Sequence, residues 1–333
     1  MKIYNIALIG CGDMGATHLE DIYFRDNIKI KYLCDLNTQR AEKFKEKYNG
    51  EFVTNNYNDC IEDENVDIVI AATYPSSHLD ILSKCIKHKK HLLCEKPIAS
   101  NLSDGKKFIK LMKDNPEVKV LVGYILRHNE TYKKVQKMIS EGAIGFPFVM
   151  RITHNHQSVD WEKHLNLIME TSPIIDCGVH YIDAMRWFTG AEPIKIEARG
   201  LRLEADVPLG KYNYGTTTIK FSDGSLGCYE VGWGKTISES NIKEFIGPKG
   251  RIKIIYSDSH TNIEGQNIIE YYKAKENKYE RYYVDFNRKP TGEELLYLIR
   301  MIEIGEQPYP CIDDVWESFK IAIKVDKIIC KNL

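Results

Sequence analysis

The sequence predicts an α/β domain with a parallel sheet, followed by an α+β domain with a mostly antiparallel, open sheet. Three observations lead to this prediction. The chain has 333 residues, and single hydrophobic cores tend to stop growing near roughly 250–300 residues. Apolar runs and amphipathic segments alternate up to Gly123, and beyond it apolar runs are joined by short turns. We therefore expect one domain over residues 1–123 and a second over residues 124–333.

The first domain is expected to alternate strands with helices. The run VDIVIAAT (66–73) is apolar almost throughout, as in a central strand that is covered on both faces. Repeated β-α units imply parallel strands with right-handed crossovers. The expected strands cover 4–10, 28–35, 66–73, 91–97 and 118–124, and the expected helices 14–24, 38–49, 77–89 and 103–114.

The second domain is expected to mix helices with hairpins. The segments FSDGSL (221–226) and GPKGRI (247–252) are typical of hairpin turns, in which glycine adopts backbone angles that other residues resist. Hairpins pair strands antiparallel. The final amphipathic segment predicts a helix over 313–331 that packs back onto the body. The other expected elements are helices at 130–142 and 175–190, and strands at 215–221, 225–233, 242–247 and 251–256.

Composition limits the class of partner and compartment. The net charge is −1, which gives no electrostatic reason to expect a nucleic-acid or anionic-membrane partner. The nine cysteines include no Cys-x-x-Cys pair, which favours reduced thiols in a cytoplasmic protein over a disulfide scaffold or a zinc ribbon. We recognise no signal-peptide pattern, and no apolar run approaches the roughly 20 residues of a membrane helix.

A glycine-rich loop follows the first expected strand. The segment IALIGCGDMGATH carries G-x-G-x-x-G at Gly10, Gly12 and Gly15. Gly10 permits the tight turn, Gly12 lets the backbone approach a pyrophosphate, and Gly15 permits close packing of helix on strand. The N-terminus of the next helix adds free N–H groups and a partial positive charge. We therefore predict a Rossmann domain whose loop binds a dinucleotide through these glycines and Cys11, Asp13 and Met14.

Asp35 ends the second expected strand, twenty residues after Gly15. A carboxylate at this position accepts hydrogen bonds from the adenosine ribose hydroxyls and repels a 2′-phosphate. No arginine directly follows it, so the sequence favours NAD over NADP. A turn or helix-cap role for Asp35 is the alternative.

Polar residues follow two further strands of this domain. Ligands of an open parallel sheet bind beyond the carboxyl ends of its strands. Lys96 is held there by Pro97, which restricts the residue before it. A partly desolvated lysine beside an oxidised nicotinamide should have a lowered pKa and exchange a proton with a substrate hydroxyl; an ion pair with Glu95 is the alternative. The residues expected to face the cofactor are Thr73, Tyr74, Pro75, His78, Glu95 and Lys96.

At this point the chain resembles the Gfo/Idh/MocA oxidoreductases, the family that includes inositol dehydrogenase and glucose–fructose oxidoreductase. The resemblance covers nearly the whole chain. It rests on GCGDMG, CDLN, AATYPSSH, CEKPIAS, GYILRHN, ISEGAIG and IIDCGVHYID in the expected order. The glycine loop is unspecific, whereas EKP with a later Asp-x-x-x-His is fairly specific. The ATYPSSH segment departs from the Thr-Pro pair followed by Asn of many relatives, and this leaves the substrate geometry near Tyr74 open.

The resemblance implies a catalytic set and an assembly. Lys96 matches the family's catalytic lysine, and Asp176 and His180 match its Asp-x-x-x-His pair. On an α-helix, residues at i and i+4 share a face, and histidine exchanges protons near neutral pH. Either Lys96 or His180 is the immediate base, and a core histidine is the alternative for His180. The family's open sheet implies a homodimer or homotetramer.

Further residues are expected near the substrate. These are Tyr124, Arg127, His154 and Trp161, with a core or interface role as the alternative for Trp161. His154 and His156 share one face of a strand. Because spacing reveals no third ligand nearby, we expect no metal site there.

The sequence therefore predicts an NAD-dependent dehydrogenase. It would transfer a hydride between the nicotinamide and a hydroxyl-bearing carbon of a sugar, inositol or sugar derivative. Two alternatives stay open. One is an elimination or transient-oxidation enzyme that recycles NADH within each turnover, and the other is a non-catalytic, NAD-binding regulator.

Overall fold

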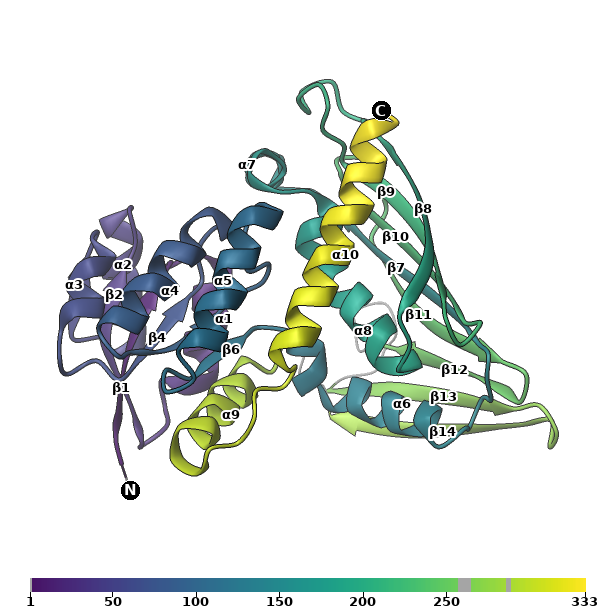
Figure 1. The fold of residues 1–333 in the computed structure, drawn as a ribbon, viewed down its shortest axis with the longest axis horizontal. Coiled ribbons are helices and arrows are strands. Elements are labelled where there is room, and N and C mark those ends of the chain that lie inside the picture. The colour runs from purple at the N-terminus through teal and green to yellow at the C-terminus, as the bar shows by residue number, and fades with distance from the viewer. Residues whose placement is uncertain (1, 257–264, 286–288) are drawn as a thin grey trace. The chain divides into compact units, whose positions relative to one another are not determined.

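The computed structural model describes residues 2–256, 265–285 and 289–333. The chain forms two compact units (Figure 1). The first unit comprises Met1–Ile125 and Lys289–Trp316, and the second comprises Leu126–Arg288 and Glu317–Leu333. The sequence analysis assigned everything after residue 123 to one domain and did not foresee that Lys289–Trp316 belongs with the N-terminal part.

The first unit is built on a parallel, six-stranded sheet in the order β3-β2-β1-β4-β5-β6. This is the strand order of a Rossmann domain, with the switch point between β1 and β4. The structure thus confirms the predicted parallel sheet and adds the short β3. The strands are β1 (Tyr4–Ile9), β2 (Ile28–Cys34), β3 (Phe52–Thr54), β4 (Ile68–Ala71), β5 (His91–Cys94) and β6 (Val120–Val122).

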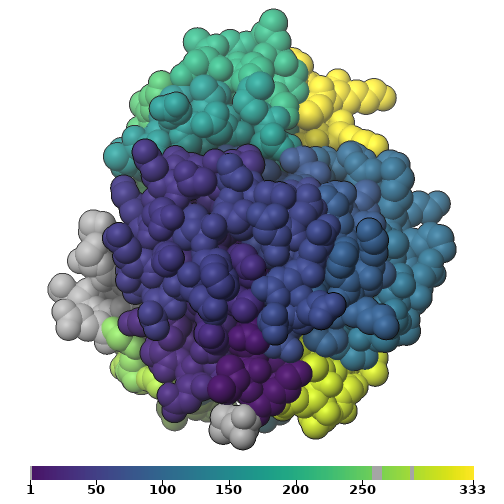
Figure 2. Space-filling view, turned by 90° about the vertical axis from the view of Figure 1, so that its left-hand side faces the viewer, coloured from purple at the N-terminus to yellow at the C-terminus, as the bar shows by residue number. Residues whose placement is uncertain are grey.

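Every residue of β4 is buried, as expected for a strand covered on both faces. The helices around the sheet are α1 (Asp13–Ile22), α2 (Thr38–Tyr48), α3 (Tyr57–Glu62), α4 (His78–Lys87), α5 (Leu102–Asp114) and α9 (Thr291–Ile304), with a 3₁₀ turn η1 (Pro75–Ser77). The purple-to-blue surface in Figure 2 is the N-terminal part of this unit.

Helix α9 joins the first unit by polar and apolar contacts with α1. The Thr291 hydroxyl donates to the Asp21 carboxylate at 2.8 Å, and the Gly292 N–H donates to the same oxygen at 2.9 Å. Asp21 thereby binds two donors at the start of α9, where free N–H groups favour a negative charge. Leu295 and Leu298 complete the core that contains Leu19.

The second unit is built on an eight-stranded sheet in the order β14-β13-β12-β11-β7-β10-β9-β8. Only the β7–β10 pair among these neighbours is parallel, so the predicted, mostly antiparallel sheet is confirmed. Gly224, with φ of +89°, lies in the predicted β9–β10 turn. The strands are β7 (Val149–Gln157), β8 (Pro193–Leu201), β9 (Tyr214–Phe221), β10 (Leu226–Gly234), β11 (Ser240–Gly247), β12 (Gly250–Ile255), β13 (Gln266–Lys273) and β14 (Lys278–Asp285).

The helical elements of the second unit are the 3₁₀ turn η2 (Ile125–His128), α6 (Glu130–Ser140), α7 (Trp161–Glu170), the π-helical turn η3 (Ile174–Gly178) and α8 (Val179–Thr189). Helix α10 (Ile312–Lys331) coincides with the expected C-terminal helix, begins in the first unit and continues in the second. Phe319 and Val325 on α10 are buried. Among the described residues, no helix combines the length and apolar character needed to cross a membrane.

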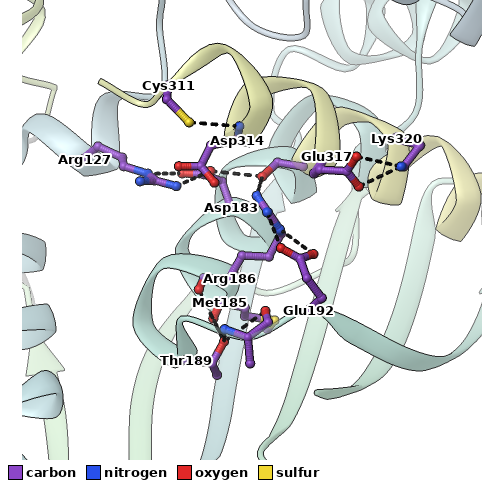
Figure 3. A network of polar contacts seen from close by, with 12 residues as sticks. Arg127, Asp183, Met185, Arg186, Thr189, Glu192, Cys311, Asp314, Glu317 and Lys320 are labelled. Carbon is purple, nitrogen blue, oxygen red and sulfur yellow. Dashed lines mark hydrogen bonds and ion pairs between the residues drawn. The ribbon is translucent and has the colours of Figure 1, made fainter. Parts of the chain in front are cut away.

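A buried polar network crosses the second unit (Figure 3). The Arg127 guanidinium donates two hydrogen bonds to the Asp183 carboxylate, at 2.8 and 2.9 Å. The Ser318 hydroxyl donates to Asp183 at 3.0 Å and accepts from Arg186 at 3.2 Å. Arg186 also pairs with Glu192 at 2.6 Å. This network ties η2, α8 and α10 together.

Candidate active site

The loop between β1 and α1 has the backbone that its three glycines allow. Gly10 has φ of +100°, and a Cβ there would lie 2.4 Å from the carbonyl oxygen of Ala72. A Cβ on Gly15 would lie 2.1 Å from the carbonyl oxygen of Gly10. A Cβ on Gly12 would meet nothing within 4 Å. Gly10 and Gly15 are therefore needed for packing, whereas the space beside Gly12 is open for a ligand to approach the backbone.

Helix α1 begins directly after this open space. Its N-cap is Gly12, which has no side chain to accept hydrogen bonds from the first turn. The first N–H groups of a helix carry a partial positive charge and bind phosphate where no capping side chain intervenes. The loop thus fits a dinucleotide pyrophosphate, with Cys11, Asp13 and Met14 as its intervening residues.

Asp35 follows β2 and is tied to the glycine loop. One of its carboxylate oxygens accepts the Cys11 N–H at 2.8 Å, and the other accepts the Asn37 N–H at 2.8 Å. The Asn37 side chain in turn caps α2 by accepting from the N–H groups of Gln39 and Arg40. Asn37, not Asp35, is therefore the helix cap, and Asp35 is held at the edge of the phosphate loop.

The β4 end forms a compact turn. The Thr73 and Ser77 hydroxyls lie 2.7 Å apart, and Ser77 also donates to the Tyr74 carbonyl at 2.9 Å. Pro75 begins the 3₁₀ turn and is buried, whereas Tyr74 is 46% exposed. Tyr74 is thus an exposed aromatic residue of this turn, beside the exposed Ser76.

His78 connects the β4 turn to the β5 turn. Its Nδ1 lies 3.0 Å from the Pro97 carbonyl oxygen and its Nε2 lies 3.2 Å from the Thr73 carbonyl oxygen. Burial lowers the pKa of His78 to about 4, although both carbonyls favour the protonated ring. A neutral His78 donates to one of these two carbonyls and lies beside the other, so it packs between the two strand ends in a positioning role.

The β5 end carries Glu95 and Lys96. Glu95 is buried, and one of its carboxylate oxygens accepts from His18 Nε2 on α1 at 2.8 Å. The other accepts the Lys96 N–H at 3.3 Å. The Lys96–Pro97 peptide bond is cis, and Lys96 is partly exposed. Glu95 thus connects α1 to the backbone of Lys96.

A second acid, Glu294, lies beside Glu95 and His18, and sequence reasoning missed it. The ligand atoms of His18, Glu95 and Glu294 all lie within 4.8 Å of one another. Glu294 is fully buried, and neither of its carboxylate oxygens has a hydrogen-bond partner among the described residues. Burial, and then the nearby Glu95 and Asp21, raise the pKa of Glu294 well above its usual range. Glu294 is therefore a neutral acid, contributed by a helix some 200 residues away in sequence.

Asp176 and His180 lie on the helical segment that starts at Ile174. The expectation of a regular α-helix across both was wrong, because Asp176 is in the π-helical turn η3 and His180 in the first turn of α8. In a π-helix the hydrogen bonds run from i to i+5, so the i, i+4 argument for a shared face does not apply. Such turns occur frequently at functional sites. Both side chains are partly exposed.

Two family models match the chain. The model described as oxidoreductase family, NAD-binding Rossmann fold, matches residues 4–124, and the GFO/IDH/MocA C-terminal domain matches residues 132–253. The chain belongs to the Gfo/Idh/MocA oxidoreductase family. It is therefore a dehydrogenase that acts on CH–OH groups and has an NAD-binding Rossmann fold.

Individual relatives support the family assignment. The myo-inositol 2-dehydrogenase of Thermotoga maritima is 28% identical over 309 residues, covering 91% of this chain and 89% of the relative. The inositol 2-dehydrogenase of Rubrobacter xylanophilus is 24% identical over 254 residues, covering 75% of this chain and 70% of the relative.

Solved structures show the same fold. The myo-inositol 2-dehydrogenase of Lactobacillus plantarum matches with a TM-score of 0.83 at 21% identity, covering 98% of this chain and 97% of that chain. A 3-ketoreductase from Actinomadura kijaniata, in complex with NADP and TDP-benzene, also matches with a TM-score of 0.83, at 18% identity and with 98% of both chains covered.

Within this Gfo/Idh/MocA protein, two expected substrate residues are buried in their own units. Tyr124 is 1% exposed, and its hydroxyl donates to the Val315 carbonyl at 3.4 Å. Arg127 is 3% exposed and forms the bidentate pair with Asp183 described above. Neither placement favours direct contact with a substrate.

The remaining expected substrate residues are more accessible. His154 and His156 lie on the same face of β7, as predicted, with their Nε2 atoms 2.8 Å apart. Trp161 begins α7 and donates from its indole nitrogen to Asp206 at 2.5 Å. Trp161 also packs against the small core that contains Trp233. It is therefore partly a core residue and partly exposed.

Proposed function

We propose that this protein is an NAD-dependent dehydrogenase of a polyhydroxylated substrate, such as inositol, a sugar or a sugar derivative. The observation that carries the proposal is the end of β5, where Lys96 follows a buried glutamate that is bonded to α1. The named activities of the relatives, inositol 2-dehydrogenases, support the substrate class. The catalytic set in this proposal is Lys96, Asp176 and His180.

Separate residues bind the cofactor, transfer the proton and bind the substrate in this proposal. NAD, when bound, supplies the carbon that accepts a hydride. The glycine loop binds the pyrophosphate through its backbone N–H groups and the start of α1. Glu95 holds the backbone of Lys96, so that the lysine amine can take the proton of the substrate hydroxyl. His180 is the second candidate for that proton, and Asp176 accepts a hydrogen bond from another hydroxyl of the substrate.

We propose NAD as the cofactor in preference to NADP. Asp35 presents a carboxylate that the Cys11 and Asn37 N–H groups hold in place. A fixed negative charge there accepts ribose hydroxyls and repels a 2′-phosphate. The NADP bound to the 3-ketoreductase of similar fold is a property of that protein.

We also propose a homodimer or homotetramer in the cytoplasm. Apolar side chains remain exposed on strands of the second unit's open sheet, at Ile194, Leu201, Ile242, Ile246, Tyr279 and Tyr283. These side chains are spread over β8, β11 and β14 and are available for contacts with another subunit, which supports the proposed assembly. No disulfide joins the nine cysteines, all of which lie in described parts of the chain, and this supports a reducing compartment. Light scattering of the purified protein measures the assembly.

The decisive experiment follows NADH formation with a panel of inositols, sugars and sugar acids. Lys96→Ala is expected to lower turnover by about 100-fold or more and to lower NAD affinity far less, because the amine acts mainly as a proton-transfer group. Lys87→Ala, which removes an exposed lysine on α4, is the matched control. Unchanged turnover in Lys96→Ala would falsify the assignment of the lysine.

The two alternatives give different results in the same assay. An enzyme that recycles its cofactor within each turnover would purify with NAD and convert a glycoside without releasing NADH. A regulator would bind NAD, act on no compound of the panel and form a stable complex with a protein partner.

A further inference from the structure

Two histidines on β7 point their ring nitrogens at each other. The Nε2 atoms of His154 and His156 lie 2.8 Å apart, and the two rings are nearly perpendicular with centroids 4.4 Å apart. Alternate residues of a strand share a face, so the H-x-H spacing alone explains why they are neighbours. The spacing does not explain why the Nε2 atoms of both rings face each other.

The outer nitrogens of both rings are occupied. His156 Nδ1 lies 3.3 Å from the carboxylate of Glu239, and His154 Nδ1 lies 2.9 Å from the Tyr181 hydroxyl. A carboxylate only accepts hydrogen bonds, so a neutral His156 donates from Nδ1 and directs the lone pair of Nε2 at His154. Histidines that bind metals almost always donate their other N–H to such a carboxylate or oxygen, which fixes the tautomer and the ring orientation.

A third donor comes from a different element. The Sγ atom of Cys177, on the π-helical turn η3, lies within 4.8 Å of a ring nitrogen of each histidine. Gly178 brings this turn close to the sheet, because a Cβ at that position would lie 3.0 Å from the Tyr229 ring on β10. Cys177 is more than twenty residues from the histidines in sequence, so their spacing gave no sign of it.

We propose that His154, His156 and Cys177 bind one zinc ion, with the fourth coordination position open to water or to an oxygen atom of a small molecule. Two imidazoles and one thiolate are ligands that zinc favours, and zinc sites with three protein ligands keep such a position. The inference goes beyond the proposed dehydrogenase activity, and the two share a neighbourhood: His154 is an expected substrate residue, and Asp176 of the proposed catalytic set lies 3.6 Å from Cys177 Sγ.

The distances require a small adjustment. With Zn–N near 2.0–2.1 Å and Zn–S near 2.3 Å, the ligand atoms of a tetrahedral site lie roughly 3.3–3.7 Å apart. The two nitrogens would therefore separate slightly, and the sulfur, which lies within 4.8 Å of them, would move inward by at most about 1 Å. All three side chains are partly exposed, and χ rotations suffice for movements of this size.

The surrounding charges permit a cation. Asp176 lies next to the site, with a carboxylate oxygen 3.6 Å from Cys177 Sγ. Zinc binding converts the Cys177 thiol to a thiolate, so the S–H bond breaks, the Zn–S bond forms and one proton passes to solvent. The neighbouring Lys243 donates to the Thr153 carbonyl at 2.8 Å and to Asn241 at 2.6 Å. Burial lowers the pKa of Lys243 well below its usual range, which weakens its repulsion of a bound cation.

The competing arrangement holds a proton in place of the metal. If Tyr181 donates to His154 Nδ1, then His154 Nε2 carries the hydrogen and donates to His156. The pair is then a polar wall of a pocket without metal. The two arrangements make opposite predictions for metal binding and for the role of Cys177.

The test uses the full-length protein, stripped with a chelator and dialysed against metal-free buffer. Zinc is titrated by calorimetry, and cobalt is titrated while its visible absorption and its thiolate-to-cobalt charge-transfer band are recorded. We expect one zinc per chain. His156→Gln and Cys177→Ser should each weaken binding by at least about 100-fold, and Cys177→Ser should abolish the charge-transfer band.

Matched controls separate binding from folding. Cys228→Ser and His164→Gln change the same residue types elsewhere in the second unit and should leave zinc affinity unchanged. Circular dichroism of the metal-free variants checks that each is folded. Binding far below one zinc per chain, or equal zinc affinity in Cys177→Ser and the wild type, would overturn the proposal and leave the proton-bridged pair. None of these measurements uses catalytic activity, so a failed dehydrogenase assay and a failed zinc site are distinguishable.

Discussion

Two regions of the molecule hold charged residues just after a strand, and the structure uses them differently. Lys96 follows β5 and stays partly exposed, with its backbone held by the buried Glu95. Arg127 follows β6 within a few residues, is 3% exposed and gives two hydrogen bonds to Asp183. The comparison teaches that a charge near a strand end is the stronger candidate for chemistry where its side chain stays partly exposed, as at Lys96, than where it is almost fully buried, as at Arg127.

The largest expected effect is the loss of stability when the buried Arg127 is replaced. Arg127→Met should lower the free energy of unfolding by about 3–5 kcal/mol, because it leaves the Asp183 carboxylate buried without its counter-ion. Denaturant unfolding measures this. Arg151→Met is the control, since Arg151 is exposed in its pair with Glu244 and should change stability by less than about 1 kcal/mol. If Arg127→Met had normal stability but a raised KM, Arg127 would contact the substrate, as the sequence predicted.

The glycine loop of the first unit offers a second comparison, between a glycine needed for packing and a glycine that leaves room for a ligand. Gly10→Ala should destabilise the protein by about 3 kcal/mol, because it places a Cβ against the Ala72 carbonyl at a positive φ. Gly12→Ala should leave the unfolding free energy nearly unchanged, since its Cβ meets nothing, but should weaken NAD binding. Thermal unfolding with and without NAD separates the two. Equal destabilisation by both substitutions would contradict the distinct roles of the two glycines.

The buried His78 should make stability depend on pH. Its pKa is lowered to about 4 in the folded protein by burial, so the unfolded chain binds a proton near pH 6.5 while the folded chain does not. Stability is therefore complete above pH 6.5 and falls by up to about 3 kcal/mol as the pH drops toward 4. His78→Gln cannot titrate, so the stability difference between wild type and variant should shrink over that window. A constant difference would show that His78 titrates normally.

The smallest expected effect concerns cofactor choice. Asp35→Asn should reduce the preference for NAD over NADP by roughly tenfold, because the repulsion of a 2′-phosphate is lost. Initial rates with each cofactor give the ratio of kcat/KM values. Asp26→Asn removes the same charge from an exposed position and should leave the ratio unchanged. A tight preference for NAD that survives Asp35→Asn would assign the selectivity to another group.

Local patterns were sufficient for most of the first unit. The apolar runs before Gly10 and through Ile70 form buried strands, as predicted. The glycine spacing predicted the tight loop between β1 and α1, whose backbone leaves no room for a Cβ at Gly10 or Gly15. The sequence did not reveal β3, β8, β13, β14, α3, α7 or α9. Strands such as β14 alternate exposed and half-buried residues without a strong apolar signal, so periodicity was uninformative there.

The candidate site was predictable where its members are close in sequence. EKP, the glycine motif and Asp176 with His180 were each recognised within a few residues of one another. His18 and Glu294 were not, because their relation to Glu95 arises only when α1 and α9 pack on the same strand end. The same reason explains Cys177, which reaches the two histidines of β7 from a helical turn.

By itself the sequence determined the alternation of strands and helices, the phosphate loop, the acid after the second strand and the lysine after the fifth. These depend on periodicity and on the backbone freedom of glycine, which act over a few residues. Only the tertiary structure decided which charges are buried in pairs, which acid is neutral and which thiol faces two imidazoles. Burial and proximity between distant segments set those properties, and they exist only once the chain has packed.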